Sequence, residues 1–177
     1  MIRLRNVVVE RVQASPRRLR MKRQGVPFGE ETFSLVSTAG YRIEAKIFRP
    51  VGDGPHPAVL LVPGTNDGHT VFEGWSQPIN AKEVAAMGWI VMTFDPAGRG
   101  ESWGEENYGG LEHQDNVRIA LRHLALQPDV DLNRLGVLSI SLGLCMACGA
   151  LASWPENPAK WLLDWEGPSD REIITSG

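Results

Sequence analysis

The alternation of apolar and polar residues changes in character along this chain. Apolar and polar positions alternate on either side of Ala39-Gly40, which predicts an antiparallel hairpin formed by Glu31–Ser37 and Tyr41–Phe48. Further along, the apolar runs have no alternation; they occupy Ala58–Val62, Trp89–Phe94, Leu135–Ile140 and Trp161–Leu163. Because continuous apolar strands are buried on both faces, these runs predict a parallel sheet covered by helices.

Helical stretches fill the gaps between these apolar runs. They are Asn80–Met87, Leu111–Leu126 and Leu142–Ala152, and Gly88 is a typical C-cap after the first. Strand and helix therefore alternate, which predicts right-handed crossovers between parallel strands. The expected fold is α/β, with a mostly parallel central sheet, an antiparallel N-terminal hairpin and helices on both faces. Ligands of such sheets bind at the carboxyl ends of the strands, so those loops are the place to look for chemistry.

The loop after Ile140 carries the clearest chemical signal. Leu135–Gly143 has the sequence LGVLSISLG, in which a buried strand runs through Ser141 into a helix of small residues. A nucleophile elbow requires this strand–turn–helix setting, with small residues two before and two after the serine, here Ser139 and Gly143. The turn raises the Ser141 hydroxyl above the sheet at a helix N-terminus, where developing negative charge is favoured. The competing interpretation makes Ser141 the N-cap of an ordinary strand–helix junction.

With these residues the chain resembles the α/β-hydrolase family over roughly residues 31–166. The usual G-x-S-x-G motif has Ser139 in place of its first glycine. The segment FDPAGRGESW after the second parallel strand is similar to the family's D-x-R-G-x-G-x-S segment, with the arginine displaced to Arg99. The resemblance implies a mainly architectural role for Asp95 and Arg99, which tie that loop down.

The resemblance also implies an oxyanion hole made of two backbone N–H groups. One belongs to the residue after the nucleophile, Leu142, and the other comes from the loop VPGTNDGHT that follows Val62. Because Pro63-Gly64 stands where the family often has His-Gly, Thr65 is the expected second donor. Two such donors stabilise a tetrahedral intermediate by several kcal/mol in general.

The activating residues are harder to assign. In the family the order is serine, acid, histidine, but the four histidines of this chain all precede Ser141. His69, in the expected oxyanion loop, is the best-placed candidate base, ahead of His113. The candidate acid is Asp164 or Glu166, after the strand that follows the nucleophile; both residues have the alternative role of lining the pocket or capping the sheet.

The distribution of charge sets the N-terminal segment apart from the rest of the chain and limits the partners that we expect. Lys and Arg crowd residues 1–23 against the single acid Glu10, so residues 1–30 are expected to be a basic extension or an edge strand over Leu4–Val12. A basic arm can bind nucleic acid or anionic lipid, but without aromatic stacking or a nucleic-acid motif a solvated segment is favoured. We expect no nucleic-acid or membrane partner, since no apolar run approaches about 20 residues.

The two cysteines, Cys145 and Cys148, form a CxxC inside the helix after the elbow. Redox CxxC motifs sit at helix N-termini and structural zinc needs more ligands, so packing against the sheet is favoured. The absence of a secretory signal together with so few cysteines favours the cytoplasm. No motif for a cofactor, metal or nucleotide is present, and none is expected.

These features lead to two hypotheses of different kinds. The first is a hydrolase of ester, thioester or peptide bonds that forms an acyl-enzyme on Ser141, with a small-molecule or peptide substrate. Residues 31–177 would then be a partial α/β-hydrolase core that ends before the last strands. The second is a non-catalytic module with a hydrolase-like scaffold. In either case the sheet edge beside Trp161–Leu163 is expected to be exposed and to invite a second copy or a complementing chain.

Overall fold

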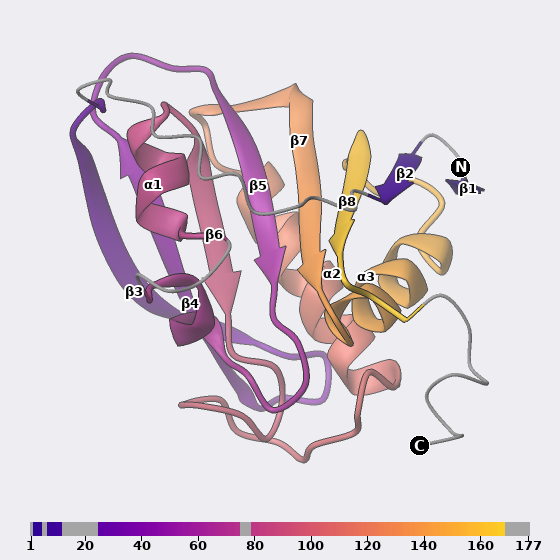
Figure 1. The fold of residues 1–177 in the computed structure, drawn as a ribbon. Coiled ribbons are helices and arrows are strands. Elements are labelled where there is room, and N and C mark those ends of the chain that lie inside the picture. Colours follow the sequence, from indigo (N-terminus) through magenta and orange to yellow (C-terminus); the bar gives the residue numbers. More distant parts are fainter. Residues whose placement is uncertain (1, 5–6, 12–24, 75–78, 169–177) are drawn as a thin grey trace.

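The computed structural model describes residues 2–4, 7–11, 25–74 and 79–168 of the chain. These residues form a single eight-stranded sheet in the order β1-β2-β8-β7-β5-β6-β4-β3 (Figure 1). The strands are β1 (Ile2–Leu4), β2 (Val7–Arg11), β3 (Phe28–Val36), β4 (Arg42–Pro50), β5 (His56–Val62), β6 (Ile90–Phe94), β7 (Val130–Ile140) and β8 (Trp161–Trp165). The helices are the 3-10 turn η1 (His69–Phe72) and the α-helices α1 (Ala81–Ala86), α2 (Leu111–Ala125) and α3 (Gly143–Ala152).

The central strands are parallel, as their continuous apolar sequences predict. β5 pairs in parallel with β6 and with β7, and β7 pairs in parallel with β8. The hairpin of β3 and β4 adds to β6 in the antiparallel sense and is longer than predicted, with pairs from Phe28↔Pro50 to Val36↔Arg42. The predicted α/β class, with a mixed N-terminal edge, is therefore confirmed.

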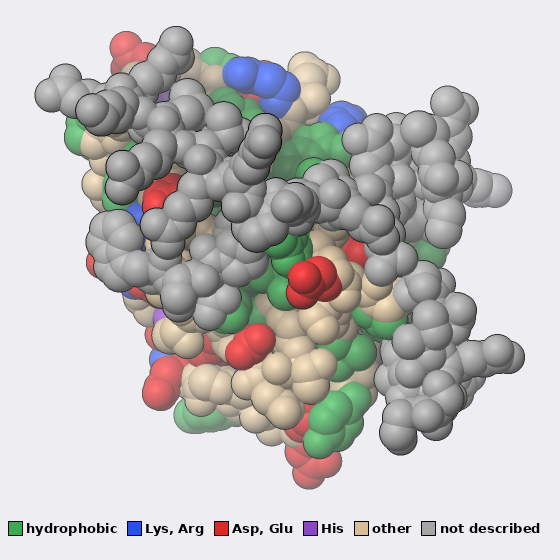
Figure 2. Space-filling model, viewed as in Figure 1, with side chains coloured by type: hydrophobic (Ala, Val, Ile, Leu, Met, Phe, Trp, Pro, Cys, Tyr) green, Lys and Arg blue, Asp and Glu red, His purple; other side chains and the backbone are tan. Residues whose placement is uncertain are grey.

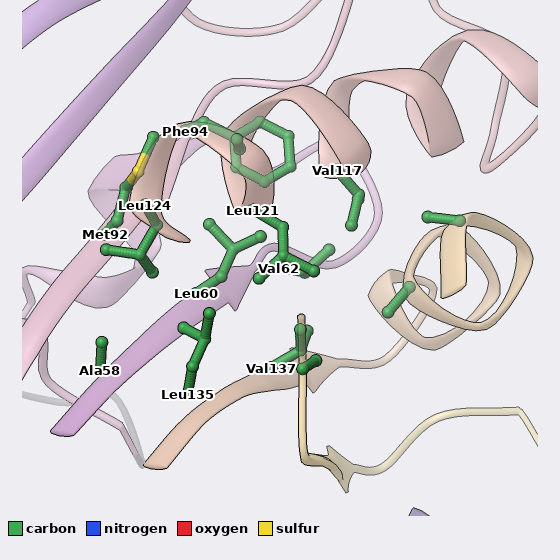
Figure 3. Packing of buried hydrophobic residues seen from close by; sticks show 14 of the residues in the cluster. Ala58, Leu60, Val62, Met92, Phe94, Val117, Leu121, Leu124, Leu135 and Val137 are labelled. Atoms are coloured by element: carbon green, nitrogen blue, oxygen red, sulfur yellow. The ribbon is translucent and has the colours of Figure 1, made fainter. Parts of the chain in front are cut away.

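Both faces of the sheet are covered, which explains why β5 shows no alternation. Leu60 and Val62 point to a core shared with α2 and α3, where they meet Leu121 (Figure 3). Val59 and Leu61 point to a second core, which α1 covers on the opposite face. A strand in this position has no solvent-facing side, so every residue from Ala58 to Val62 is buried.

Two elements differ from the prediction. β7 begins at Val130 rather than Leu135, because His56 pairs with Val130 across a register shift and draws that segment into the sheet. The open edge expected beside Trp161–Leu163 is wrong for the described residues, because β2 lies parallel to β8 along it. This pairing joins residues far apart in sequence, and the apolar pattern of either strand alone does not encode it.

Several predictions fall outside the described residues. These are most of the basic segment, over residues 12–24, and the C-terminal residues 169–177. Within the described part of the chain, none of the helices is both long and apolar enough to cross a bilayer.

Candidate active site

The turn between β7 and α3 holds Ser141 in a strained backbone conformation. Its φ is +52°, in the left-handed region that non-glycine residues rarely adopt. The Ser141 N–H donates to the Trp165 carbonyl oxygen at 2.8 Å, and the Leu144 N–H donates to the Ser141 carbonyl oxygen at 3.0 Å. Such a residue costs about 1–3 kcal/mol and persists only where its surroundings fix it, which is common at active sites.

Close packing beneath the turn explains the small residues that the sequence places around Ser141. A Cβ atom on Gly143 would lie 2.7 Å from the carbonyl oxygens of both Val62 and Pro63. A Cβ atom on Gly64 would lie 3.3 Å from the Ser141 Cβ. The loop after β5 is therefore pressed against the serine turn, and the steric requirement predicted for Gly143 is confirmed.

The two predicted oxyanion donors lie on either side of this contact. Thr65 follows Gly64 in the loop after β5, and Leu142 follows Ser141 at the start of α3. Within the described part of the chain, neither of their backbone N–H groups donates to a protein acceptor.

The loop after β6 is fixed by Asp95 and Arg99, as predicted. The Asp95 carboxylate, 1 % exposed, accepts the Glu101 N–H at 2.8 Å and the His69 N–H at 2.6 Å. The Arg99 guanidinium, 5 % exposed, donates to the Gly64 carbonyl oxygen and pairs with Glu106. These contacts join the loops after β5 and β6, so the architectural role is confirmed.

His69 forms a histidine–carboxylate pair with Asp95. Its Nδ1 lies 2.7 Å from the Asp95 Oδ1, and because a carboxylate only accepts, Nδ1 carries the proton. The Nε2 of the neutral ring is then an acceptor, and its nearest charged neighbour is the Glu73 Oε1 at 3.6 Å. The hydrogen bond to Asp95 is the main reason that the pKa of His69 lies above its ordinary value. A carboxylate bound in this way fixes the tautomer and the orientation of the imidazole ring.

The other histidines have structural roles. His113 is fully buried; its Nδ1 accepts the Gly109 N–H at 3.1 Å and its Nε2 donates to the Ala97 carbonyl oxygen at 2.9 Å. Burial lowers the pKa of His113, so it is neutral and both ring nitrogens are engaged. His123 packs on Phe33, and His56 starts β5 at the amino end, away from the serine turn.

The two candidate acids lie on either side of the end of β8. Asp164, 2 % exposed, accepts from the Ser139 hydroxyl at 3.3 Å and from the Gly167 N–H at 3.0 Å. It faces α3 beneath the serine turn, and its charge reaches the two cysteines of that helix. Glu166 is exposed at the tip of the turn, with a φ of +60°. Among the described residues, the carboxylate within hydrogen-bond distance of a histidine ring is that of Asp95.

Asp67 and Glu106 belong to the site but were not singled out from the sequence. The Asp67 Oδ2 lies 3.5 Å from the Cβ position of Gly64, the same point that lies 3.3 Å from the Ser141 Cβ. Glu106 accepts from Arg99 and from the Tyr108 N–H at 2.7 Å. Their only sequence signal was their position in the two loops that face the carboxyl ends of the strands.

Comparison with known proteins identifies the architecture. No protein-family model matches the sequence, and no curated protein matches it significantly. Solved structures do match. A hypothetical protein from Pseudomonas aeruginosa superposes with a TM-score of 0.70 at 20% identity, over 88% of this chain and 48% of that one. An alpha/beta hydrolase from Penicillium sp. superposes with a TM-score of 0.60 at 19% identity, over 78% of this chain and 45% of that one.

The described chain has the α/β-hydrolase fold. An esterase from Exiguobacterium antarcticum is similar to it with a TM-score of 0.60 and 15% identity, over 81% of this chain and 49% of that one. The chain therefore spans about half the length of the α/β-hydrolase-fold proteins it resembles. Within this fold, Ser141 lies at the turn between β7 and α3.

The surroundings of the serine turn are more acidic than basic. Glu101, Glu105 and Glu112 are exposed in the loop after β6 and at the start of α2. Acidic side chains lie over the lower half and at the upper left of the face in Figure 2, and Lys and Arg side chains lie at its top and along its left side. The buried Arg99 is paired with Glu106.

Apolar and sulfur groups complete the surroundings of the turn. Trp103 and Tyr108 are 64 % and 67 % exposed in the loop after β6, while Trp75 lies outside the described residues. Cys145 and Cys148 lie in α3, and burial raises the pKa of the Cys148 thiol to about 11. A thiol with that pKa stays protonated at neutral pH, which opposes a redox role for the CxxC.

Proposed function

We propose that the chain is the nucleophile-bearing part of a serine hydrolase that cleaves ester, thioester or peptide bonds through an acyl-enzyme on Ser141. The conformation of Ser141 carries the proposal. It has a positive φ at the tip of a strand–helix turn, with Gly143 packed too tightly beneath it for any side chain. A strained serine that lies between two backbone N–H groups without an acceptor among the described residues supports a reactive hydroxyl.

The chemistry follows from the positions of these groups. The Ser141 hydroxyl attacks the substrate carbonyl carbon while a base takes its proton, and the carbonyl oxygen becomes an anion. The Thr65 and Leu142 N–H groups stabilise that anion. The intermediate collapses with release of the alcohol, thiol or amine, which takes the proton from the base. Water then attacks the acyl carbon while the base takes its proton. The bond between the acyl carbon and the Ser141 oxygen breaks, that oxygen takes the proton from the base, and the carboxylic acid is released.

The base has two candidate sources. Within the chain, His69 has its Nδ1 bound to Asp95 and its Nε2 lone pair available, the protonation pattern that a general base needs. The family resemblance instead supplies a histidine from sequence beyond the strands described here, with Asp164 or Glu166 as the acid. His69→Asn separates the two, because it removes labelling of Ser141 only if His69 is the base.

A fluorophosphonate probe tests the nucleophile directly. We expect the chain to be labelled at Ser141 and Ser141→Ala to be unlabelled. Ser139→Ala is the matched control, since Ser139 is fully buried within β7 two residues earlier. Equal labelling of the wild type and Ser141→Ala, or no labelling of either, would contradict the proposal for this chain.

The alternative is a non-catalytic module that binds a ligand or a complementing chain. Its support is that His113 and His123 are placed in structural contacts and that His56 lies at the amino end of β5, which leaves one histidine near the site. If the probe fails, size measurement of the chain mixed with a separately expressed downstream segment distinguishes this case. Formation of a stable one-to-one complex without labelling would favour the module.

A further inference from the structure

We propose that Arg99 and Glu106 are the positioning residues of the oxyanion hole: Arg99 sets the orientation of the Thr65 donor, and Glu106 supports the segment that lies against the Leu142 side chain. The inference rests on the proposed function of Ser141 for its kinetic consequences, but its structural claim stands separately. Neither side chain contacts Ser141, so both act through the peptide groups that they hold. The observations that carry it are the contacts of one nearly buried guanidinium.

The first set of contacts joins Arg99 to the loop after β5. The Arg99 Nη1 donates to the Gly64 carbonyl oxygen, and more weakly to the Asp67 carbonyl oxygen at 3.5 Å. In a trans peptide the C=O and N–H groups point in opposite directions. Holding the Gly64 oxygen on Arg99 therefore turns the Thr65 N–H away from Arg99. Gly64 itself lies against Ser141, so that N–H is presented beside the serine turn.

The second set of contacts joins the Arg99–Glu106 pair to the segment before α2. Glu106 takes two hydrogen bonds from Arg99, one of them at 2.9 Å between Nη2 and Oε1, and accepts the Tyr108 N–H at 2.7 Å. Tyr108 has a φ of +51°, and the Cβ position of the next residue, Gly109, lies 3.8 Å from the Leu142 side chain. The pair thus supports the segment that packs against the second donor residue.

Arginine fits this task better than lysine. Its planar fork meets a carboxylate on one edge while the remaining N–H groups reach a carbonyl oxygen, whereas an ammonium group offers no fixed directions. The ion pair also keeps the charge of Arg99 satisfied while it is 5 % exposed. Without the guanidinium, the buried Gly64 oxygen would lose its donor, and rotation of that peptide toward another donor would be favoured.

Crystal structures and labelling kinetics of three variants test the proposal. Arg99→Met removes both sets of contacts, whereas Arg99→Lys restores a single donor. Glu106→Gln weakens the ion pair while it keeps the size of the side chain. Arg134→Met is the matched control, because Arg134 also binds a carboxylate, that of Asp131, and a carbonyl oxygen, that of Pro55, but lies exposed at the opposite end of β7. Thermal unfolding monitors whether each variant is folded.

In the structures, we expect the Gly64–Thr65 peptide to be rotated in Arg99→Met and native in the Arg134→Met control. In kinetics, we expect the limiting rate of Ser141 phosphonylation to fall about 100-fold in Arg99→Met, the loss typical of one oxyanion donor. The probe concentration at half-saturation should stay unchanged, with partial recovery in Arg99→Lys and an intermediate loss in Glu106→Gln.

Each outcome bears on one proposal. If the Gly64–Thr65 peptide keeps its native orientation in Arg99→Met, the inference is overturned whatever the labelling kinetics. If Arg99→Met does not fold, a native orientation in both Glu106→Gln and Arg99→Lys overturns it. A limiting rate of Ser141 phosphonylation equal to the wild-type rate in all three variants would also overturn the inference. The proposed function of Ser141 would then still hold. A rotated peptide in a chain that is not labelled would support the positioning role and count against the hydrolase.

Discussion

Gly143 offers the sharpest test of how the serine turn is built. Replacing it with alanine adds one methyl group at a point 2.7 Å from the carbonyl oxygens of Val62 and Pro63. Real Cβ atoms do not approach so closely, and both contacts are to backbone at the end of a central strand, which cannot move aside. Overpacking of this kind costs about 1–3 kcal/mol, and the slightly better helix propensity of alanine offsets only part of it.

The expected result for Gly143→Ala is a free energy of unfolding lower by about 1–3 kcal/mol, measured by urea titration with an unchanged slope. For a chain of this size, that corresponds to a melting temperature lower by roughly 2–12 °C. Labelling of Ser141 should fall as well, because α3 can only accept the methyl group by shifting the turn.

Gly149→Ala on the same helix is the control for Gly143→Ala. Its Cβ would meet only the side chain of Gln114, whose amide donates to the Gly109 carbonyl oxygen at 3.1 Å. Losing that hydrogen bond costs about 0.5–1.5 kcal/mol and alanine regains about 0.5–1 kcal/mol, so the net change should be small. A Gly143→Ala chain as stable as Gly149→Ala, with wild-type labelling, would refute the packing argument.

Two further predictions concern the core and the histidine pair. Leu121→Ala removes a fully buried side chain between α2 and the sheet and should lower the free energy of unfolding by about 2–5 kcal/mol, which urea titration measures; a loss below about 1 kcal/mol would contradict the packing of Figure 3. His69→Asn should destabilise the chain more at pH 5.5 than at pH 9. The hydrogen bond to Asp95 raises the pKa of His69 above 6.5, so its charged pairing contributes fully below that value and is lost as pH rises through the raised pKa. Urea titrations at both pH values check this, and an equal loss at each would argue that the pair is not charged in the folded state.

Much of the fold could be predicted from the sequence because its signals are local. The apolar runs of β5, β6 and β7 have no alternation, and a strand of that kind needs helices on both faces. Asn80 and Gly88 marked the ends of α1, where Asn80 caps the helix through the Lys82 N–H at 2.9 Å. The serine turn was equally local, because its steric demands fall on residues within two positions of Ser141.

The sequence by itself thus determined the α/β plan and the place of Ser141, and only the tertiary structure decided what surrounds that serine. The Arg99–Gly64 and His69–Asp95 contacts join residues 35 and 26 positions apart. Which carboxylate meets a histidine depends on how two loops cross, since Asp95 in the loop after β6 meets His69 in the segment after β5. Periodicity reports which face of an element is buried, but it holds no information about how the segments that follow the strands cross one another. His69 and Asp95 both lie in such segments, after β5 and after β6.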